Sequence, residues 1–113
     1  MRCPFCAIVA RKEPARIVHE DDDTLAFEDL RPRAPTHVLV VPKKHVPTMN
    51  DLGPEDAEVM GKLFRVAAKI AKDRSLADRG WRAIVNANRH AGQTVFHIHL
   101  HVIGGRAMGW PPG

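Results

Sequence analysis

The segment from Val95 to Ile103 reads Val-Phe-His-Ile-His-Leu-His-Val-Ile, with a histidine at every second position of its central part. Successive side chains of a β-strand point to opposite faces of the sheet, so this alternation predicts a strand with His97, His99 and His101 on one face. The other face, expected to be buried, carries Phe96, Ile98, Leu100 and Val102. Three imidazoles in a row suit stability poorly, since each loses hydration on burial and each transfers protons near neutral pH. The row therefore indicates a functional site.

Two kinds of chemistry suit such a row of histidines. Alternate histidines on a strand can share a zinc ion. A neutral imidazole nitrogen can instead attack an electrophile, while neighbouring imidazoles fix its tautomer and carry protons. The residues before the strand, Gly92, Gln93 and Thr94, offer a flexible backbone, an amide and a hydroxyl. Backbone N–H groups of such a turn can hold phosphate oxygens, and Asn86, at the end of the preceding expected strand, could reach the same place.

The rest of the chain predicts an α+β fold with a mostly antiparallel sheet, one long helix and a short N-terminal helix. Gly53-Pro54-Glu55-Asp56 has the chemistry of a helix start and apolar residues follow at helical spacing, so we expect a helix over about residues 54–75. We assign its Met60 and Phe64 to the core. The other expected elements are a short helix within 4–12, an extended piece at 16–19, a turn at 21–23, strands at 25–29, 37–41, 81–86 and 95–103, a polar loop at 88–93 and an irregular tail at 106–113.

The 113 residues suffice for one domain, which we expect to span residues 1–113. With 44% hydrophobic and 27% charged residues, the composition is that of a soluble globular protein rather than a disordered one. The formal net charge is +4, and the basic residues are scattered, which argues against a nucleic-acid-binding protein. Apolar runs such as Val38–Val41 are far shorter than the ~20 residues of a membrane-spanning helix, and the N-terminus has no signal-peptide pattern. We therefore expect a cytoplasmic protein with no membrane partner.

The pattern His-apolar-His-apolar-His-apolar-apolar at 97–103 is similar to the signature of the histidine triad (HIT) family, and the resemblance covers nearly the whole chain. The other stretches that resemble its nucleotide-binding Hint branch are Leu25–Asp29, Ala34–His37, Val41–His45, Gly92–Thr94, Gly104–Arg106 and Trp110–Gly113. The resemblance implies a HIT-like fold and a homodimeric hydrolase of purine nucleotides. The implied substrates are nucleoside 5′-phosphoramidates and aminoacyl adenylates, which are cleaved to nucleoside monophosphates with no cofactor required for catalysis.

The resemblance also implies roles for individual residues. His99 is the expected nucleophile, which attacks the α-phosphorus and forms a nucleotidyl-histidine intermediate that water then hydrolyses. His101 is expected to contact the phosphate, with His37 and His97 in support. The expected nucleotide-binding residues are Asp29 for the ribose hydroxyls, Phe5, Ile8, Phe27 and Leu30 for the base, and Asn86, Gly92, Gln93 and Thr94 for the phosphate and the leaving group. Thr94 stands where the family often has serine; the hydroxyl is kept, and the added methyl group is expected to alter leaving-group preference.

Cys3 and Cys6 lie near the start of the sequence in the spacing Cys-Pro-Phe-Cys. In a protein expected to be intracellular, this spacing favours metal or redox chemistry over a structural disulfide, but a zinc ion would need two further ligands. Some bacterial histidine triad proteins, and the related galactose-1-phosphate uridylyltransferases, pair such cysteines with two histidines. That resemblance implies a structural zinc on Cys3, Cys6, His45 and His97. The alternative is two reduced thiols in an apolar segment.

Three other functions remain open on the sequence. One is a dinucleoside polyphosphate hydrolase, against which the closing Trp-Pro-Pro-Gly argues. Another is a nucleotide-binding regulatory module without catalysis. The third is a metal hydrolase that uses the row of histidines as ligands. We assign His19 and His90 to the surface, and Trp110 either anchors the tail or contributes to specificity.

Overall fold

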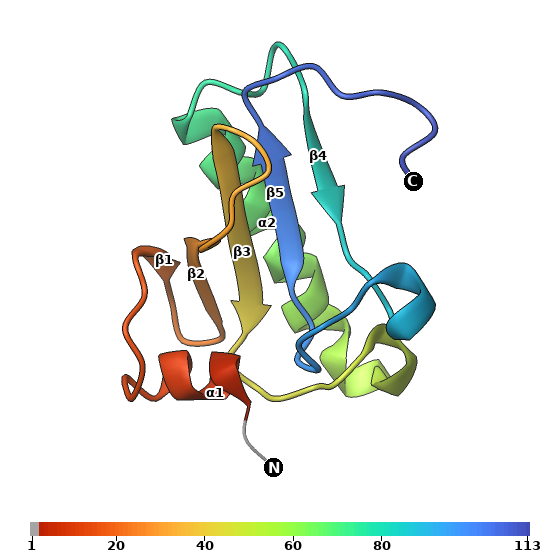
Figure 1. Ribbon diagram of the computed structural model, residues 1–113. Coiled ribbons are helices and arrows are strands. Elements are labelled where there is room, and N and C mark those ends of the chain that lie inside the picture. Colours follow the sequence, from red (N-terminus) through yellow and green to blue (C-terminus); the bar gives the residue numbers. More distant parts are fainter. Residues whose placement is uncertain (1–2) are drawn as a thin grey trace.

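Figure 1 shows the computed structural model, which describes residues 3–113. Its strands form one antiparallel sheet in the order β1-β2-β3-β5-β4. The elements are α1 (Pro4–Val9), β1 (Ile17–Glu20), β2 (Thr24–Glu28), β3 (Thr36–Pro42), α2 (Ala57–Asp73), β4 (Trp81–Ile84) and β5 (Leu100–Gly104), with short 3-10 turns at Met49–Asp51, Pro54–Asp56 and Arg89–Ala91. The predicted α+β class, with one long helix and a short N-terminal helix, is confirmed. None of the helices in residues 3–113 combines the length and the apolar character that crossing a bilayer requires.

The central strands are buried on both faces of the sheet. One face lies against α2, which crosses behind the sheet in Figure 1. The buried residues of this layer are Ala26, Val38, Val40, Val46, Leu63, Val66, Ala67, Ile70, Ile98, Leu100 and Val102. On the opposite face, Phe5 of α1 packs over Leu25, Phe27, Leu39 and Val41. Because α1 has only six residues, it covers only part of this second face.

The long helix begins close to its predicted start. Pro54–Asp56 forms a 3-10 turn, and α2 follows at Ala57. The Asp56 carboxylate accepts hydrogen bonds from the Gly53 N–H (2.9 Å) and from Lys44 Nζ (2.7 Å), which together fix the entry to the helix. The helix ends at Asp73, two residues before the expected end.

Phe64 of α2 differs from its expected place in the core. The stripe that α2 buries against the sheet consists of Leu63, Val66, Ala67, Ile70 and Ala71. Phe64 lies at the margin of this stripe and is 56% exposed, so its assignment to the core is wrong. Met60, one turn earlier, packs half-buried against the core. The outer face of α2 therefore carries an aromatic side chain that this chain does not cover.

The last strand is shorter than predicted. Its register pairs Val40 with Leu100, and continuation of this register would place Ile98 opposite Pro42. Proline has no N–H to donate, so the ladder stops there and β5 begins only at Leu100. The Ile98 N–H donates instead to the carbonyl of Val46 (2.8 Å). The residues before Leu100 thus form an irregular segment rather than a strand.

The predicted alternation of faces holds in part of this segment. Ile98, Leu100 and Val102 are buried in the layer under α2, as predicted. Phe96 is 38% exposed, so the prediction that it shares their buried face is wrong. It precedes the strand, and the two-residue period does not extend to it.

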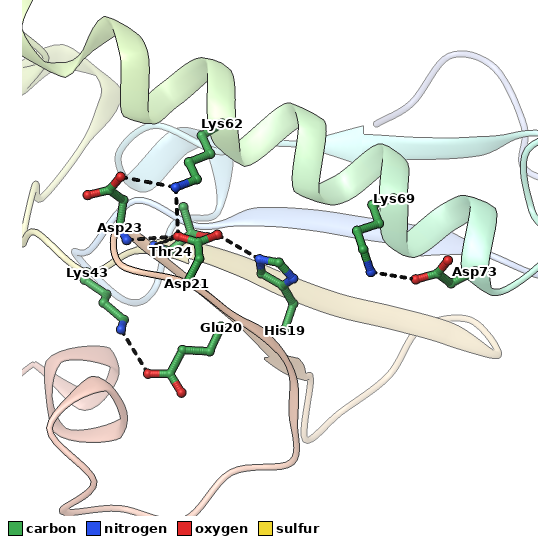
Figure 2. Close-up of polar contacts among 9 residues, drawn as sticks. All are labelled: His19, Glu20, Asp21, Asp23, Thr24, Lys43, Lys62, Lys69 and Asp73. Atoms are coloured by element: carbon green, nitrogen blue, oxygen red, sulfur yellow. Dashed lines mark hydrogen bonds and ion pairs between the residues drawn. The ribbon is translucent and has the colours of Figure 1, made fainter.

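One carboxylate ties the turn between β1 and β2 to α2. Asp21 accepts hydrogen bonds from the N–H groups of Asp23 and Thr24 (both 2.9 Å) and from the Thr24 hydroxyl (2.6 Å). His19 Nε2 (2.7 Å) and Lys62 Nζ of α2 (3.2 Å) reach the same carboxylate (Figure 2). Burial raises the pKa of Asp21, but these hydrogen bonds outweigh burial and hold the pKa well below its usual range. His19, expected at the surface, is therefore half-buried beside Asp21.

Asp21→Ala is expected to lower the free energy of unfolding by about 2 kcal/mol, because it leaves the donors on Thr24 and His19 without their acceptor. Asp73→Ala is the matched control, since among residues 3–113 the Asp73 side chain makes only an exposed pair with Lys69 (3.0 Å; Figure 2). Such pairs contribute little to stability. Urea unfolding followed by circular dichroism measures both variants. Equal losses in the two would contradict the role of Asp21 in tying the turn to the helix.

Candidate active site

A cavity of about 350 Å³ opens beside α1, on the face of the sheet that this helix only partly covers. One part of its lining is apolar and the rest is polar. The apolar lining residues are Pro4, Phe5, Ile8, Pro14, Ala15, Phe27, Leu30, Leu39 and Val95. The polar ones are Glu28, Asp29, Arg31, Thr94, His99 and His101. Apolar walls with a few polar groups are usual for a site that binds a small molecule.

A second hollow, of about 610 Å³, adjoins this cavity near the end of β2. The two share Asp29 and Leu30, and His37 lines only the second. Leu30 is 95% exposed and so lies at the rim rather than in a closed slot. The Asp29 carboxylate is therefore reached from both hollows.

The pairing of β3 with β5 brings two histidines together. His101 pairs with Leu39 in the register, so it lies on the same face as Leu39 and His37. His37 Nε2 is 2.9 Å from His101 Nδ1 and 3.4 Å from Asp29 Oδ2, and the Arg33 N–H donates to His37 Nδ1 (3.0 Å). Burial lowers the pKa of His37. Burial, reinforced by the neighbouring histidines, lowers the pKa of His101 to about 4. Both rings are therefore neutral at pH 7.

His99 is buried, and its ring lines the cavity. Its Nδ1 lies 2.8 Å from the main-chain carbonyl of His97. A carbonyl can only accept, so Nδ1 carries the proton and Nε2 keeps a lone pair. Burial lowers the pKa of His99, and Phe5 packs edge-on against its ring at 5.1 Å between centroids. A neutral imidazole with a free Nε2 can act as a nucleophile.

His97 is fully buried, and its ring does not line the cavity. Nε2–H donates to the carbonyl of Pro42 (2.7 Å), which leaves the lone pair on Nδ1. That nitrogen is 3.4 Å from Cys3 Sγ, 3.5 Å from Cys6 Sγ and 3.2 Å from His45 Nδ1. His45 Nδ1 is in turn 3.3 Å from Cys6 Sγ. The structure thus brings together all four residues of the expected zinc set.

This donor set fits a zinc ion. Tetrahedral zinc with bonds of about 2.0–2.3 Å places neighbouring ligand atoms roughly 3.3–3.8 Å apart. The distances given above run from 3.2 to 3.5 Å. Burial, followed by the proximity of Cys3, raises the pKa of Cys6, so a nearby cation would be needed to hold its thiolate. Burial lowers the pKa of His97, which keeps it neutral as a metal ligand must be.

The three histidines of the row do not converge on one metal position. His97 faces the cysteines, whereas His101 belongs to a separate cluster with Asp29 and His37. Within residues 3–113, neither cluster of metal-ligating side chains includes His99. The geometry therefore does not support a single ion held by the row.

The loop before the row uses its polar groups in different ways. Gln93 is buried, and its Oε1 accepts from the Asn88 N–H (2.7 Å). Its Nε2 donates to the carbonyls of Pro47 (2.7 Å) and Val95 (3.1 Å). The amide of Gln93 therefore holds the loop and is not part of the cavity lining, in contrast to its expected place on the phosphate.

Other expected binding residues are divided between the cavity and its surroundings. Thr94 lines the cavity with Phe5, Ile8 and Phe27, and its side chain is exposed. Asn86 is half-buried outside the lining. Gly92 ends the 3-10 turn with φ of 88°, a left-handed conformation that glycine adopts without strain, and is also outside the lining. His90 is exposed, as expected.

Several groups that shape the site were not anticipated. The Arg33 N–H and the carbonyls of Pro42 and His97 are main-chain groups, which every residue type supplies, so no side-chain pattern could indicate them. Pro14 and Ala15 line the cavity from the connection between α1 and β1, where no periodic pattern marks their position.

Comparisons with known proteins find relatives of this chain. The family model described as "HIT domain" matches residues 10–108. A purine nucleoside phosphoramidase from Escherichia coli (strain K12) is 47% identical over 105 residues, which cover 93% of this chain and 88% of that protein.

Two solved structures extend the comparison. A HIT family hydrolase from Legionella pneumophila Philadelphia 1 has 47% identity and a TM-score of 0.97, covering 99% of this chain and 100% of that one. A zinc-bound histidine triad family protein from Mycobacterium smegmatis has 40% identity and a TM-score of 0.81, covering 94% of this chain and 76% of that one.

Stability is expected to fall as the pH drops from 6.5 towards 4. The ordinary histidine pKa is 6.5, whereas burial holds His101 at about 4, so in this window the unfolded chain binds more protons. Urea unfolding at pH values across the window measures the slope. His101→Gln is expected to flatten it, and His90→Gln, at an exposed position, to leave it unchanged. An unaltered slope in His101→Gln would contradict the lowered pKa of the half-buried His101.

Proposed function

The chain belongs to the HIT domain family and is a hydrolase, and on that basis we propose that it cleaves purine nucleoside 5′-phosphoramidates to nucleoside monophosphates. The observation that carries the proposal is His99, whose Nδ1–H is held by the His97 carbonyl and whose neutral ring lines the cavity. The purine nucleoside phosphoramidase from Escherichia coli supports the substrate class. We propose that residues 1–113 act as one HIT domain.

The proposed reaction proceeds in two displacements at the α-phosphorus. His99 Nε2 attacks phosphorus, the bond from phosphorus to the substrate nitrogen breaks, and the departing amine takes up a proton. Water then adds its oxygen to the phosphorus and releases one proton, which balances the proton that the amine took up; the phosphorus–histidine bond breaks, and the monophosphate leaves as His99 recovers its lone pair. Two easier displacements replace one difficult hydrolysis. Aminoacyl adenylates offer the same α-phosphorus with a carboxylate as leaving group.

The cavity supports a role for each part of the nucleotide. Phe5 and Phe27, whose rings meet edge to face at 5.3 Å between centroids, are proposed to contact the base with Ile8. Asp29 is proposed to accept hydrogen bonds from the ribose hydroxyls. Its Oδ1 already accepts from the Arg31 N–H (2.7 Å), which fixes the orientation of the carboxylate. Leu30 would close the slot at its rim.

The remaining polar groups are proposed to act on the phosphate and the leaving group. Thr94, an exposed hydroxyl of the lining, would contact the leaving group. Gln93 would act through the loop that it holds rather than by direct contact. Gly92 and Asn86 do not line the cavity either, so they too would act without direct contact with the substrate.

Wild-type protein is expected to release a fluorescent amine from an adenosine 5′-phosphoramidate. His99→Ala is expected to lower kcat/KM by roughly a thousandfold or more, as for removal of a nucleophile. His90→Ala, at an exposed position, serves as the control and should retain the wild-type rate. Wild type quenched with alkali during turnover, which preserves a phosphorus–histidine bond that acid would break, should carry a nucleotidyl group on the peptide that contains His99.

Other results would point elsewhere. Absence of amine release by folded wild type that still binds nucleotide would contradict the phosphoramidase and favour a regulatory binding module. Preferred cleavage of a dinucleoside polyphosphate would favour that class of hydrolase instead.

We further propose that Cys3, Cys6, His45 and His97 hold a structural zinc ion, which the zinc-bound protein from Mycobacterium smegmatis supports. Such an ion would fasten α1, which lines the cavity, to the segment that carries His99. Neither cysteine is in a disulfide, so both sulfurs are available as ligands, and a reducing cytoplasm maintains that state. We therefore keep the cytoplasm as the proposed location.

Protein purified in the presence of zinc is expected to contain about one zinc ion per chain, because the four donors match the number of ligands that a structural zinc ion takes. Cys6→Ser should lose the metal and show a lower Tm, whereas His90→Gln should keep both metal and Tm. Elemental analysis and thermal unfolding measure these values. Equal zinc contents in Cys6→Ser and wild type would contradict the assigned ligands.

A homodimer is the proposed assembly. β4 is an edge strand of the sheet, with one side open to a second strand, and α2 exposes Phe64. An open edge and an uncovered aromatic side chain both favour association with a second copy.

Sedimentation equilibrium should give twice the mass of one chain for wild type and for Asp73→Ala, and a weaker dimer for Phe64→Asp. A wild-type protein with the mass of a single chain would contradict the proposal.

A further inference from the structure

The main-chain N–H of Arg33 makes an unusual contact for a backbone group. It donates to His37 Nδ1 at 3.0 Å. A backbone N–H can only donate, so His37 Nδ1 must supply a lone pair and cannot carry a proton. His37 is only 4% exposed, and its one ring proton is therefore on Nε2.

The protonated nitrogen of His37 determines the state of the next ring. His37 Nε2–H points at His101 Nδ1 (2.9 Å), with Asp29 Oδ2 as a second acceptor at 3.4 Å. Because His101 Nδ1 accepts this hydrogen bond, the single proton of neutral His101 is on Nε2. The His101 ring lines the cavity beside His99, with 4.9 Å between centroids.

We propose that the Arg33 N–H is a tautomer lock: by fixing the proton of His37 on Nε2, it makes His101 present an Nε2–H donor to the substrate phosphate. Its effect on turnover rests on the proposed function, whereas the tautomers themselves do not. Without the lock, His37 could carry its proton on Nδ1, and His101 would then donate back through its own Nδ1. A lone pair on His101 Nε2 would then face an anionic phosphate. Arg33 is thus a positioning residue, which acts through two rings.

The same lock closes this cluster to metal ions. Asp29, His37 and His101 offer one oxygen and two nitrogens within 4.8 Å of one another, a set that could hold a divalent cation. To bind a metal ion through Nε2, His37 would have to move its proton to Nδ1. That N–H and the Arg33 N–H would then face each other as two donors with no acceptor between them. At His97 the opposite holds, since Nε2–H is bound to the Pro42 carbonyl and Nδ1 is free for a metal.

The connection from β2 to β3 holds the Arg33 N–H in place. Arg106 Nε donates to the carbonyl of Arg33 (2.8 Å), and the Asp29 N–H donates to the carbonyl of His37 (2.9 Å). Gly105, with φ of +94°, lies against Pro35, where a Cβ would come within 2.9 Å of the proline ring. The N–H is therefore fixed by contacts on both sides of it, independently of any ligand.

Nuclear magnetic resonance of ¹⁵N-labelled wild type tests the tautomers directly and needs no turnover. We expect a coupling across the hydrogen bond between the Arg33 amide nitrogen and His37 Nδ1. The ring nitrogen shifts should show the Nε2–H tautomer for both His37 and His101. A proton on Nδ1 of either ring at neutral pH would overturn the proposal, even if the enzyme hydrolyses phosphoramidates. The expected tautomers in an inactive protein would leave the lock intact and reject the proposed substrate.

Two substitutions at one position test the consequence. Arg33→Pro removes both the arginine side chain and the main-chain N–H. Arg33→Ala removes the side chain but keeps the N–H. We expect kcat of Arg33→Pro to be about 100-fold below that of Arg33→Ala, the size of effect seen for one oriented donor. Added Ni²⁺ should inhibit Arg33→Pro at concentrations at least about tenfold lower than Arg33→Ala. Equal kcat and equal Ni²⁺ inhibition in two folded variants would overturn the proposal; if Arg33→Pro fails to fold, the wild-type tautomers decide.

Discussion

Antiparallel pairing of β3 with β5 is the interaction on which the site depends. It places His37 beside His101 on the face that α1 leaves partly open, and its last pair is Val40 with Leu100, just before Pro42, which has no N–H to continue the ladder. The residues before Leu100 are therefore not part of the sheet, and their hydrogen bonds go to groups outside it, such as the Val46 carbonyl. His99 and His97 turn away from each other in this released segment, one towards the cavity and the other towards the cysteines.

Main-chain groups decide where the protons of the buried rings of His37, His97 and His99 lie. The carbonyl of His97 takes the Nδ1–H of His99, the carbonyl of Pro42 takes the Nε2–H of His97, and the N–H of Arg33 occupies Nδ1 of His37. Burial keeps the rings neutral, so each has one proton and one lone pair to place. A peptide group cannot change between donor and acceptor. The arrangement is therefore a property of the fold before any ligand enters.

Much of the fold could be predicted from the sequence because it rests on periodic burial. Ile98, Leu100 and Val102 repeat every second residue and lie where that repeat places them. Phe96 fits the same pattern in the sequence, but its side chain is exposed. It lies before the start of β5, and where that strand starts depends on Pro42 of the partner strand. Phe64 satisfies a helical spacing but lies at the margin of the buried stripe, a difference that only packing decides.

The site divides in a similar way. The four zinc residues that the resemblance implied lie together in the structure. Gln93 has the right chemistry for a phosphate, but three main-chain groups take its amide. The spacing of residues in the sequence does not show that main-chain groups compete with a ligand for this amide.

The side chain and the main chain of His97 contact different neighbours. Its ring serves the cysteines and His45, while its peptide oxygen orients His99. Any amino acid at this position would still supply the oxygen. The histidine side chain at position 97 therefore matters for the contacts with Cys3, Cys6 and His45, whereas the orientation of His99 depends only on the main chain.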